Sequence, residues 1–299
     1  ARSLKGQCSR IVGLVFPTVA NPFYAEMVYR IESFLADAGY RVILCNSDDH
    51  PDLEEQYFEM LLSNQVDGII TSAHSQVVAN LPHVQAPLVT VDRPGTQKYP
   101  NIRADNYAGA RMAVEHLVAT GARNILHITS TVSEQNLRLA GYWDAVTAAG
   151  LPPQVLELGF RTPLPRKREL IERYLKESTA GERADAVFAS NDTYAVMALN
   201  WARTRNLCVP QDFQVVGFDG TETVRALIPE LATVVQPIEQ IAARAVQRLL
   251  QTIESGRQGR PDDTPSPHKS DKKQQGSTAD VFPVHLHEGG TLRAITVSS

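Results

Sequence analysis

The sequence has few of the features that mark secreted, zinc-binding or membrane proteins. Its three cysteines, Cys8, Cys45 and Cys208, lie far apart and form no CxxC pair. This spacing excludes a disulfide framework and a structural zinc site, and it indicates reduced thiols in the cytoplasm. No stretch approaches the roughly 20 uncharged apolar residues that a membrane span requires. The N-terminus also lacks the apolar segment of a secretory signal, although a mature exported protein would lack it too.

Enzyme signatures are missing as well. The sequence contains no GxxxxGK[ST] phosphate loop, no GxGxxG after a strand, no GxSxG elbow and no HExxH motif. His285 and His287 share one face of a predicted strand, but without a third ligand nearby an ordinary strand is favoured over a metal site. We therefore expect no catalytic residues, no cofactor and no metal. The net charge of -4 restricts any contact with nucleic acid to a local surface.

Short β-branched runs alternate with amphipathic helical segments along the chain. The apolar run at residues 11–16 is typical of a strand buried on both faces. Asn21 then stands at an N-cap, Pro22 at the first helical position, and Gly39 at the helix end. This alternation predicts an α/β protein with parallel sheets and crossover helices. With 299 residues and 43% hydrophobic content, two doubly wound lobes are expected.

Capping residues, charge patterns and composition predict several of the remaining elements. Asp52 and Glu55 form a capping box that predicts a helix from there to Leu61. Residues 166–173 read as the exposed start of a helix, because acidic and basic side chains are interleaved there. Residues 256–280 have almost nothing to bury, so a solvated surface loop is expected, with a binding or phosphorylated tail as the alternative. A final strand is predicted at residues 281–287. Further strands are predicted at residues 40–45, 66–72, 86–92, 124–130, 155–158, 186–190, 213–219 and 232–237.

Polar and aromatic side chains stand just after these strands, where ligands bind in an open parallel sheet. They are Asn21, Phe23, Tyr24, Asp92, Arg138, Phe160, Asn191, Asp192, Asp219 and Gln236. Carboxylates, amides, a guanidinium and aromatic rings together suit a polyhydroxylated ligand. Structural roles are the alternative: Asp92 could start a turn, and Asn191 with Asp192 could cap the following helix. Phe23 could belong to the core.

Several segments in this order and spacing resemble the lactose-repressor/galactose-repressor (LacI/GalR) family of bacterial transcription regulators. They include "SRIVGLVFPTVANPFYAEM", "VTVDRP", "LRLAGYWDA", "VFASNDTYAVMAL", "VVGFDGTE" and "VVQPIEQIAARAV". The resemblance covers residues 1 to about 251 and resumes at "VFPVHLHEGGTLR". It implies a periplasmic-binding-protein-like fold in which the chain crosses between two lobes three times. The N-terminal lobe would hold residues 9–104 plus 237–280, and the C-terminal lobe residues 105–236 plus 281–299.

The resemblance also implies a role for each strand-end residue. The residues that would bind the effector are Phe23, Tyr24, Asp92, Arg138, Phe160, Asn191, Asp219 and Gln236. Residues 1–8 resemble the end of the family's hinge helix, in which Leu4 would enter the DNA minor groove and Arg2 and Lys5 would contact phosphates. A segment this short should be disordered without operator DNA, or ordered only by crystal contacts.

The expected function is therefore that of an effector-binding and dimerisation domain of a cytoplasmic, sugar-responsive repressor. Its partners would be a small-molecule effector (a sugar or sugar acid), a second copy in a homodimer, and operator DNA. The operator would be bound through a helix-turn-helix that this sequence does not contain, and no membrane partner is expected. Two alternatives share the α/β architecture: a periplasmic sugar-binding protein of a transport system and a sugar-processing enzyme.

Overall fold

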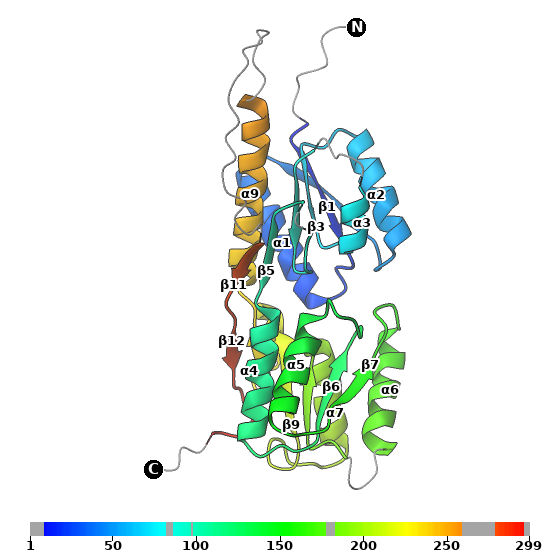
Figure 1. Cartoon of the computed structure of the whole chain (residues 1–299), viewed down its shortest axis with the longest axis vertical. Helices are drawn as coiled ribbons and strands as arrows, with labels where there is room; N and C mark the ends of the chain where they lie inside the picture. Colours follow the sequence, from blue (N-terminus) through cyan, green and yellow to red (C-terminus); the bar gives the residue numbers. More distant parts are fainter. Residues whose placement is uncertain (1–8, 82–85, 97, 178–182, 259–278, 296–299) are drawn as a thin grey trace. The chain divides into compact units, whose positions relative to one another are not determined.

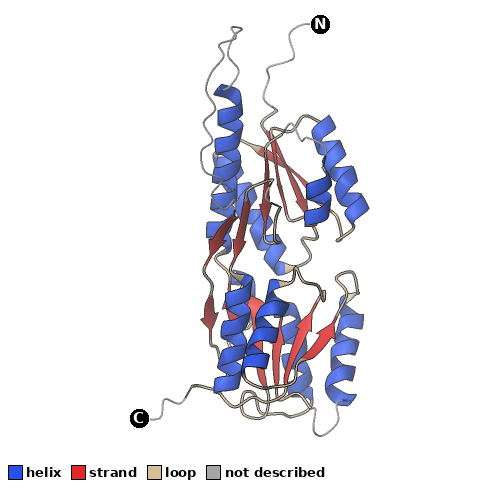
Figure 2. Cartoon of the chain, viewed as in Figure 1, coloured by secondary structure: helices blue, strands red, loops and turns tan. Residues whose placement is uncertain are grey.

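The structure, a computed structural model, describes residues 9–81, 86–96, 98–177, 183–258 and 279–295. The chain forms two compact units. Unit 1 contains Ala1–Arg103 and Ile238–Phe282, and unit 2 contains Ala104–Pro237 and Pro283–Ser299. The chain thus passes from one unit to the other three times, and each unit is built on a sheet that is mainly parallel (Figures 1 and 2). The predicted fold class is confirmed.

Unit 1 has a six-stranded sheet in the order β11-β5-β4-β3-β1-β2. The β1–β2, β1–β3, β3–β4 and β4–β5 pairs are parallel. In Figure 1, α1 and α9 lie on one side of this sheet and α2 and α3 on the other. Its strands are β1 (Ile11–Phe16), β2 (Arg41–Asn46), β3 (Gly68–Thr71), β4 (Leu88–Val91), β5 (Asn101–Ala104) and β11 (Ala279–Phe282), and its helices are α1 (Pro22–Asp37), α2 (Pro51–Ser63), α3 (Ser75–Asn80) and α9 (Ile238–Gln258).

The first strand and helix form where the sequence predicts them. Residues 12–16 of β1 are buried, as the continuous apolar run indicated. The side chain of Asn21 accepts a hydrogen bond from the amide of Phe23 at 2.9 Å, and Pro22 is the first residue of α1. Because the cap fixes the first turn of α1, it also fixes the position of Tyr24 at the end of the sheet.

Unit 2 has a sheet in the order β12-β10-β9-β8-β6-β7. Its edge strand β12 is antiparallel to β10, whereas the other pairs are parallel. Its strands are β6 (Ile125–Thr129), β7 (Gln154–Glu157), β8 (Ala186–Ala189), β9 (Gln214–Asp219), β10 (Ala232–Val235) and β12 (His285–His287), and its helices are α4 (Asn106–Ala119), α5 (Leu137–Ala148), α6 (Leu164–Glu177), α7 (Asp192–Thr204) and α8 (Glu222–Leu227). One apolar cluster joins α4 and α5 to the sheet, and another joins α6 and α7 to it.

A buried tyrosine ties α5 to the neighbouring strands of unit 2. The Tyr142 hydroxyl lies 2.8 Å from the carbonyl oxygen of Ile125 and accepts a hydrogen bond from the Gln154 amide at 2.7 Å. Its side chain is fully buried, and burial raises the pKa of the phenol to about 12. The hydroxyl therefore stays protonated and joins the ends of β6 and β7.

We expect Tyr142→Phe to lower the free energy of unfolding by about 1–3 kcal/mol, since it leaves buried backbone groups without this partner. The ring remains, so packing should be unchanged. Urea unfolding monitored by circular dichroism measures the change. Tyr29→Phe is the control, because Tyr29 is 63% exposed. Equal stability of the two variants would contradict this account of the hydroxyl.

The structure corrects four of the predicted elements. Helix α2 begins at Pro51, and its N-cap residue His50 makes no side-chain hydrogen bond to the helix. The predicted capping box at Asp52 and Glu55 is therefore wrong. The helix can begin at Pro51 because the proline ring already fixes φ at a helical value. Helix α9 runs to Gln258 and β11 starts at Ala279, so the predicted loop at 256–280 is too long at both ends. Residues 259–278 of that loop lie outside the described part.

The predicted final strand is two strands, β11 in unit 1 and β12 in unit 2, with Pro283 between them. Residues 166–173 are not exposed throughout, because Lys167 and Ile171 are buried.

Candidate functional site

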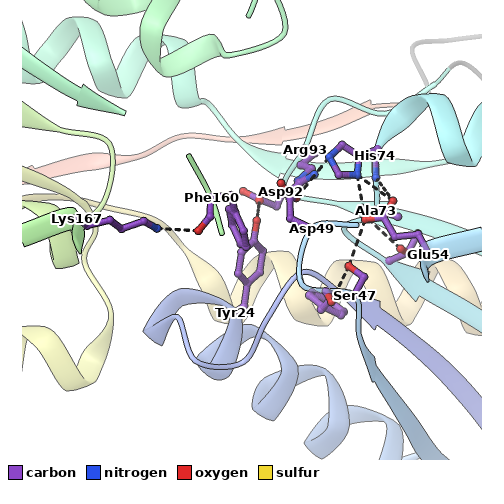
Figure 3. Close-up of polar contacts among 12 residues, drawn as sticks. Tyr24, Ser47, Asp49, Glu54, Ala73, His74, Asp92, Arg93, Phe160 and Lys167 are labelled. Carbon is purple, nitrogen blue, oxygen red and sulfur yellow. Dashed lines mark hydrogen bonds and ion pairs between the residues drawn. The ribbon is translucent and has the colours of Figure 1, made fainter. Parts of the chain in front are cut away.

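Tyr24 and Asp92 meet at the carboxyl end of the sheet of unit 1 (Figure 3). The Tyr24 hydroxyl donates a hydrogen bond to Oδ2 of Asp92 at 2.9 Å. Asp92 directly follows β4 and has a φ of +66°, in the left-handed region that few non-glycine residues occupy. Burial and the Asp92 carboxylate raise the pKa of Tyr24, so the phenol stays protonated and continues to donate. The two residues predicted from separate strand ends are therefore in direct contact.

Phe23 precedes this pair on α1. Its side chain is 3% exposed, and its ring centroid lies 5.1 Å from that of Tyr24 in an edge-to-face arrangement. Such pairs stabilise aromatic clusters beyond the area that they bury. Phe23 thus packs against the Tyr24 ring as a buried core residue, which is the alternative given for it from the sequence.

A chain of ionisable side chains continues from Asp92 into unit 1 (Figure 3). Arg93 donates to Oδ1 of Asp49 at 2.5 Å, and Nε2 of His74 lies 3.5 Å from the same oxygen. Nδ1 of His74 lies 3.0 Å from Oε2 of Glu54, whose side chain is fully buried. Sequence reasoning missed these four residues. They belong to separate loops and helices, and nothing in the local sequence pattern joins residues so far apart in the chain.

Arg138 is the centre of a second cluster, in unit 2. Its Nε donates to Oδ1 of Asn106 at 2.7 Å, and its Nη1 donates to the Ser190 carbonyl and to Oδ1 of Asp219, the latter at 3.1 Å. The guanidinium also lies over the ring of Phe218, 3.8 Å from its centroid. Charge-assisted bonds in a forked arrangement fix both the position and the plane of the guanidinium.

Asp219 and Gln236 complete this cluster at the ends of β9 and β10. Nε2 of Gln236 donates to Oδ1 of Asp219 at 2.9 Å, and Asp219 has a φ of +105°. Gln236 is 3% exposed, and its Oε1 accepts no hydrogen bond from any residue that the structure describes. A buried acceptor without a donor costs about 1–3 kcal/mol. A hydroxyl group of a ligand would supply that donor.

Asp192 lies behind the cluster and is buried. Its carboxylate accepts hydrogen bonds from Oγ1 of Thr233 at 2.6 Å and from the Gly220 amide at 2.9 Å. Gly217 allows this approach, because a Cβ atom there would collide with the Asp192 carboxylate. Burial raises the pKa of Asp192 to about 6, against the opposing effect of its hydrogen bonds.

Asn191 and Phe160 are held by local contacts instead of by the Arg138 cluster. The side chain of Asn191 caps α7 by accepting from the Tyr194 amide at 2.9 Å, which is the structural alternative noted for this residue. The Phe160 carbonyl accepts from Nζ of Lys167 at 2.8 Å (Figure 3). Unit 2 thus joins Arg138, Asp219 and Gln236, and the effector-binding roles of all eight predicted residues remain predictions.

The remaining predictions concern the N-terminal segment and the cysteines. Arg2, Leu4 and Lys5 are outside the described residues, as is Cys8. Cys45 is buried and Cys208 exposed, and both are free thiols. Within the described ranges, no group of three or more His, Cys, Asp or Glu side chains is placed to hold a metal ion. None of the helices in those ranges combines the length and apolar character needed to cross a bilayer.

Two units with mainly parallel sheets, joined by three chain crossings, define the class of periplasmic-binding-protein-like domains. A family model described as "Periplasmic binding protein-like domain" matches residues 114–270. The sucrose operon repressor of Pediococcus pentosaceus is 39% identical over 258 residues, which cover 85% of this chain and 78% of that protein. The ribose operon repressor of Halalkalibacterium halodurans is 32% identical, with 85% of this chain and 76% of that protein covered.

A solved structure is similar over nearly the whole chain. It is a periplasmic binding protein/LacI transcriptional regulator from Alkaliphilus metalliredigens in complex with D-xylulofuranose. Its identity is 28%, its TM-score is 0.77, and the match covers 96% of this chain and 100% of that one. The chain therefore belongs to the LacI/GalR family of transcription regulators, and it contains the effector-binding domain.

Proposed function

We propose that this chain is the effector-binding and dimerisation part of a sugar-responsive repressor that acts in the cytoplasm as a homodimer on operator DNA. The binding of a sugar is inferred from the cluster of Arg138, Asp219 and Gln236, whose side chains are held by hydrogen bonds to one another. Oε1 of Gln236 is a buried acceptor that has no donor among the described residues, and a sugar hydroxyl could supply one. The sugar-operon names of the relatives support the regulatory part.

The charges of the two clusters favour a neutral sugar over a sugar acid or a sugar phosphate. Arg93 is paired with Asp49, and Arg138 with Asp219. Asp92 adds a further carboxylate, whose described partner is the neutral Tyr24 hydroxyl. Because each of these two guanidinium groups already has its own carboxylate, neither offers an unpaired cation to an anionic ligand, and Asp92 adds a negative charge beside the first cluster. Hydroxyl groups both donate and accept, so they suit this mixture of partners.

Regulation requires only that the sugar bind two states of the dimer with different affinity. Typical coupling energies in allosteric proteins are about 1–3 kcal/mol, which changes operator affinity by about 5- to 150-fold. The operator itself would be read by a helix-turn-helix of the kind found in this family.

Calorimetric titration of the 299-residue chain tests the ligand class. Sucrose, D-ribose and D-xylulose represent neutral sugars, and D-glucuronate and glucose 6-phosphate represent anionic ones. At least one neutral sugar should bind, and at 100 times its Kd it should stabilise the fold by about 2.7 kcal/mol. The anionic ligands should bind at least ~10-fold more weakly, a difference of about 1.4 kcal/mol. Tighter binding of an anion would contradict the charge argument, and no binding of any sugar would contradict the proposed function.

A further inference from the structure

Lys167 is a buried lysine at the start of α6, a helix whose other basic residues are mostly exposed. The residue is 7% exposed, and no carboxylate of the described chain lies within ion-pair distance of its ammonium group. Burial lowers the pKa of Lys167, which reflects the cost of removing a charge from water. A buried cation without a carboxylate is uncommon, so the contacts that compensate it identify its role.

Three contacts stabilise the ammonium group, and two of them involve one residue. Nζ donates to the Phe160 carbonyl oxygen at 2.8 Å and lies 5.8 Å from the centroid of the Phe160 ring. It also lies 5.3 Å from the centroid of the Tyr194 ring, close to the start of α7. Lys167 thus holds both the backbone and the side chain of Phe160, through a charge-assisted hydrogen bond and a cation–π contact (Figure 3).

Phe160 lies in the loop between β7 and α6. Within it, the Thr162 amide donates to the Gly159 carbonyl at 2.9 Å, which forms a tight turn around Phe160. The Lys167 amide in turn donates to the Pro163 carbonyl at 2.9 Å, which fixes the base of the lysine side chain on the helix. The long side chain therefore links the rigid helix to the tip of the turn.

We propose that Lys167 is a positioning residue that holds the Phe160 ring as a flat platform for the apolar face of a bound sugar. This inference rests on the proposed function, since it assigns a ligand to the Phe160 ring. A lysine suits this task because its stem spans the turn and its ammonium group satisfies the Phe160 carbonyl. Its effect on the ligand passes through Phe160, so the two residues should act as one unit.

A double-mutant cycle on the 299-residue chain tests this coupling, with sucrose, D-ribose and D-xylulose as the probes. Lys167→Met should weaken the best of these sugars about 10-fold, and Phe160→Ala should weaken it at least as much. In the Phe160→Ala background, Lys167→Met should cause no further loss. Lys167→Arg, which keeps the cation and its donors, should recover part of the affinity. Lys176→Met, an exposed lysine of the same helix, is the matched control and should leave the Kd unchanged.

Amide exchange provides a second readout that needs no ligand. In Lys167→Met, amides 160–162 should exchange several-fold faster than in the wild-type chain, whereas the amides of β6 should keep their rates. Unchanged exchange at 160–162, or full additivity of the two substitutions on the Kd, would overturn this inference. A wild-type chain that binds no sugar would overturn the proposed function, and the exchange rates would still decide separately whether Lys167 holds the turn.

Discussion

Replacing Arg138 with methionine is expected to weaken sugar binding by at least ~100-fold. Truncating one partner of a buried, hydrogen-bonded charge pair costs about 2–5 kcal/mol, and 2.8 kcal/mol corresponds to a factor of about 100 in Kd. Arg138 connects Asn106, Ser190 and Asp219, so its loss releases all three groups at once. Methionine keeps much of the apolar volume over Phe218, which limits the effect of packing.

Two control variants separate the role of the guanidinium from a general loss of stability. Arg111→Met removes an exposed arginine of α4 whose ion pair with Glu115 is on the helix surface, so binding should be unchanged. Arg138→Lys keeps the charge but loses the fork, and it should bind with intermediate affinity. Calorimetry gives the Kd values, and thermal unfolding shows whether each variant is folded. A folded Arg138→Met variant that binds the sugar within threefold of the wild-type Kd would exclude Arg138 from the site.

The sequence predicts those residues of the candidate site whose position follows from local structure. The apolar run of β1 and the Asn21 cap of α1 are local signals, and together they place Tyr24 at a strand end. Asp92 directly follows β4 and Asp219 is the last residue of β9, and both strands are buried, so the rule that ligands bind beyond the carboxyl ends of parallel strands was enough to select them as candidates. Such positions can be predicted because each depends on fewer than ~20 consecutive residues.

The remaining contacts depend on side chains that are distant in the sequence. Asp49 and Arg93 are separated by 44 positions, and their pairing requires the chain to take a positive φ at Asp49 and at Asp92. The sequence does not predict a positive φ at these two positions, because neither residue is glycine. Lys167 was taken for an exposed residue, since its neighbours are charged, and only the packing of α6 against Tyr194 shows its burial. Elements β5, α3 and α8 were missed because they are too short to show periodicity.

Unit 2 should also show two opposing pH dependences of stability, which arise from His127 and Asp192. His127 is fully buried on β6, between the rings of Tyr142 and Phe188. Burial lowers its pKa from 6.5 to about 4, so the folded state keeps the ring neutral where the unfolded chain binds a proton. The stability linked to neutral His127 is complete above pH 6.5 and is lost as the pH falls toward 4. The total is about 3 kcal/mol, at 1.36 kcal/mol for each pKa unit.

Asp192 has the opposite dependence. Its pKa is raised by burial from 3.8 to about 6, so the folded state favours the protonated carboxyl. The stability linked to this group is complete below pH 3.8 and is lost as the pH rises through 6, again by about 3 kcal/mol. Between pH 4 and 6 the two slopes have opposite signs and similar size. The wild-type unit should therefore show little net change in stability from these two groups over that range.

Single substitutions should separate the two slopes. His127→Gln should leave a chain whose stability falls between pH 4 and 6, whereas Asp192→Asn should leave one whose stability rises between pH 4 and 6.5. Both tryptophans of the chain, Trp143 and Trp201, belong to unit 2, so their fluorescence during urea unfolding follows this unit alone. The double variant is the matched control, because it has lost both titrating groups and should again be flat. Slopes of the same sign in the two single variants would show that one of the two groups ionises differently, since opposite pKa shifts require opposite proton linkage.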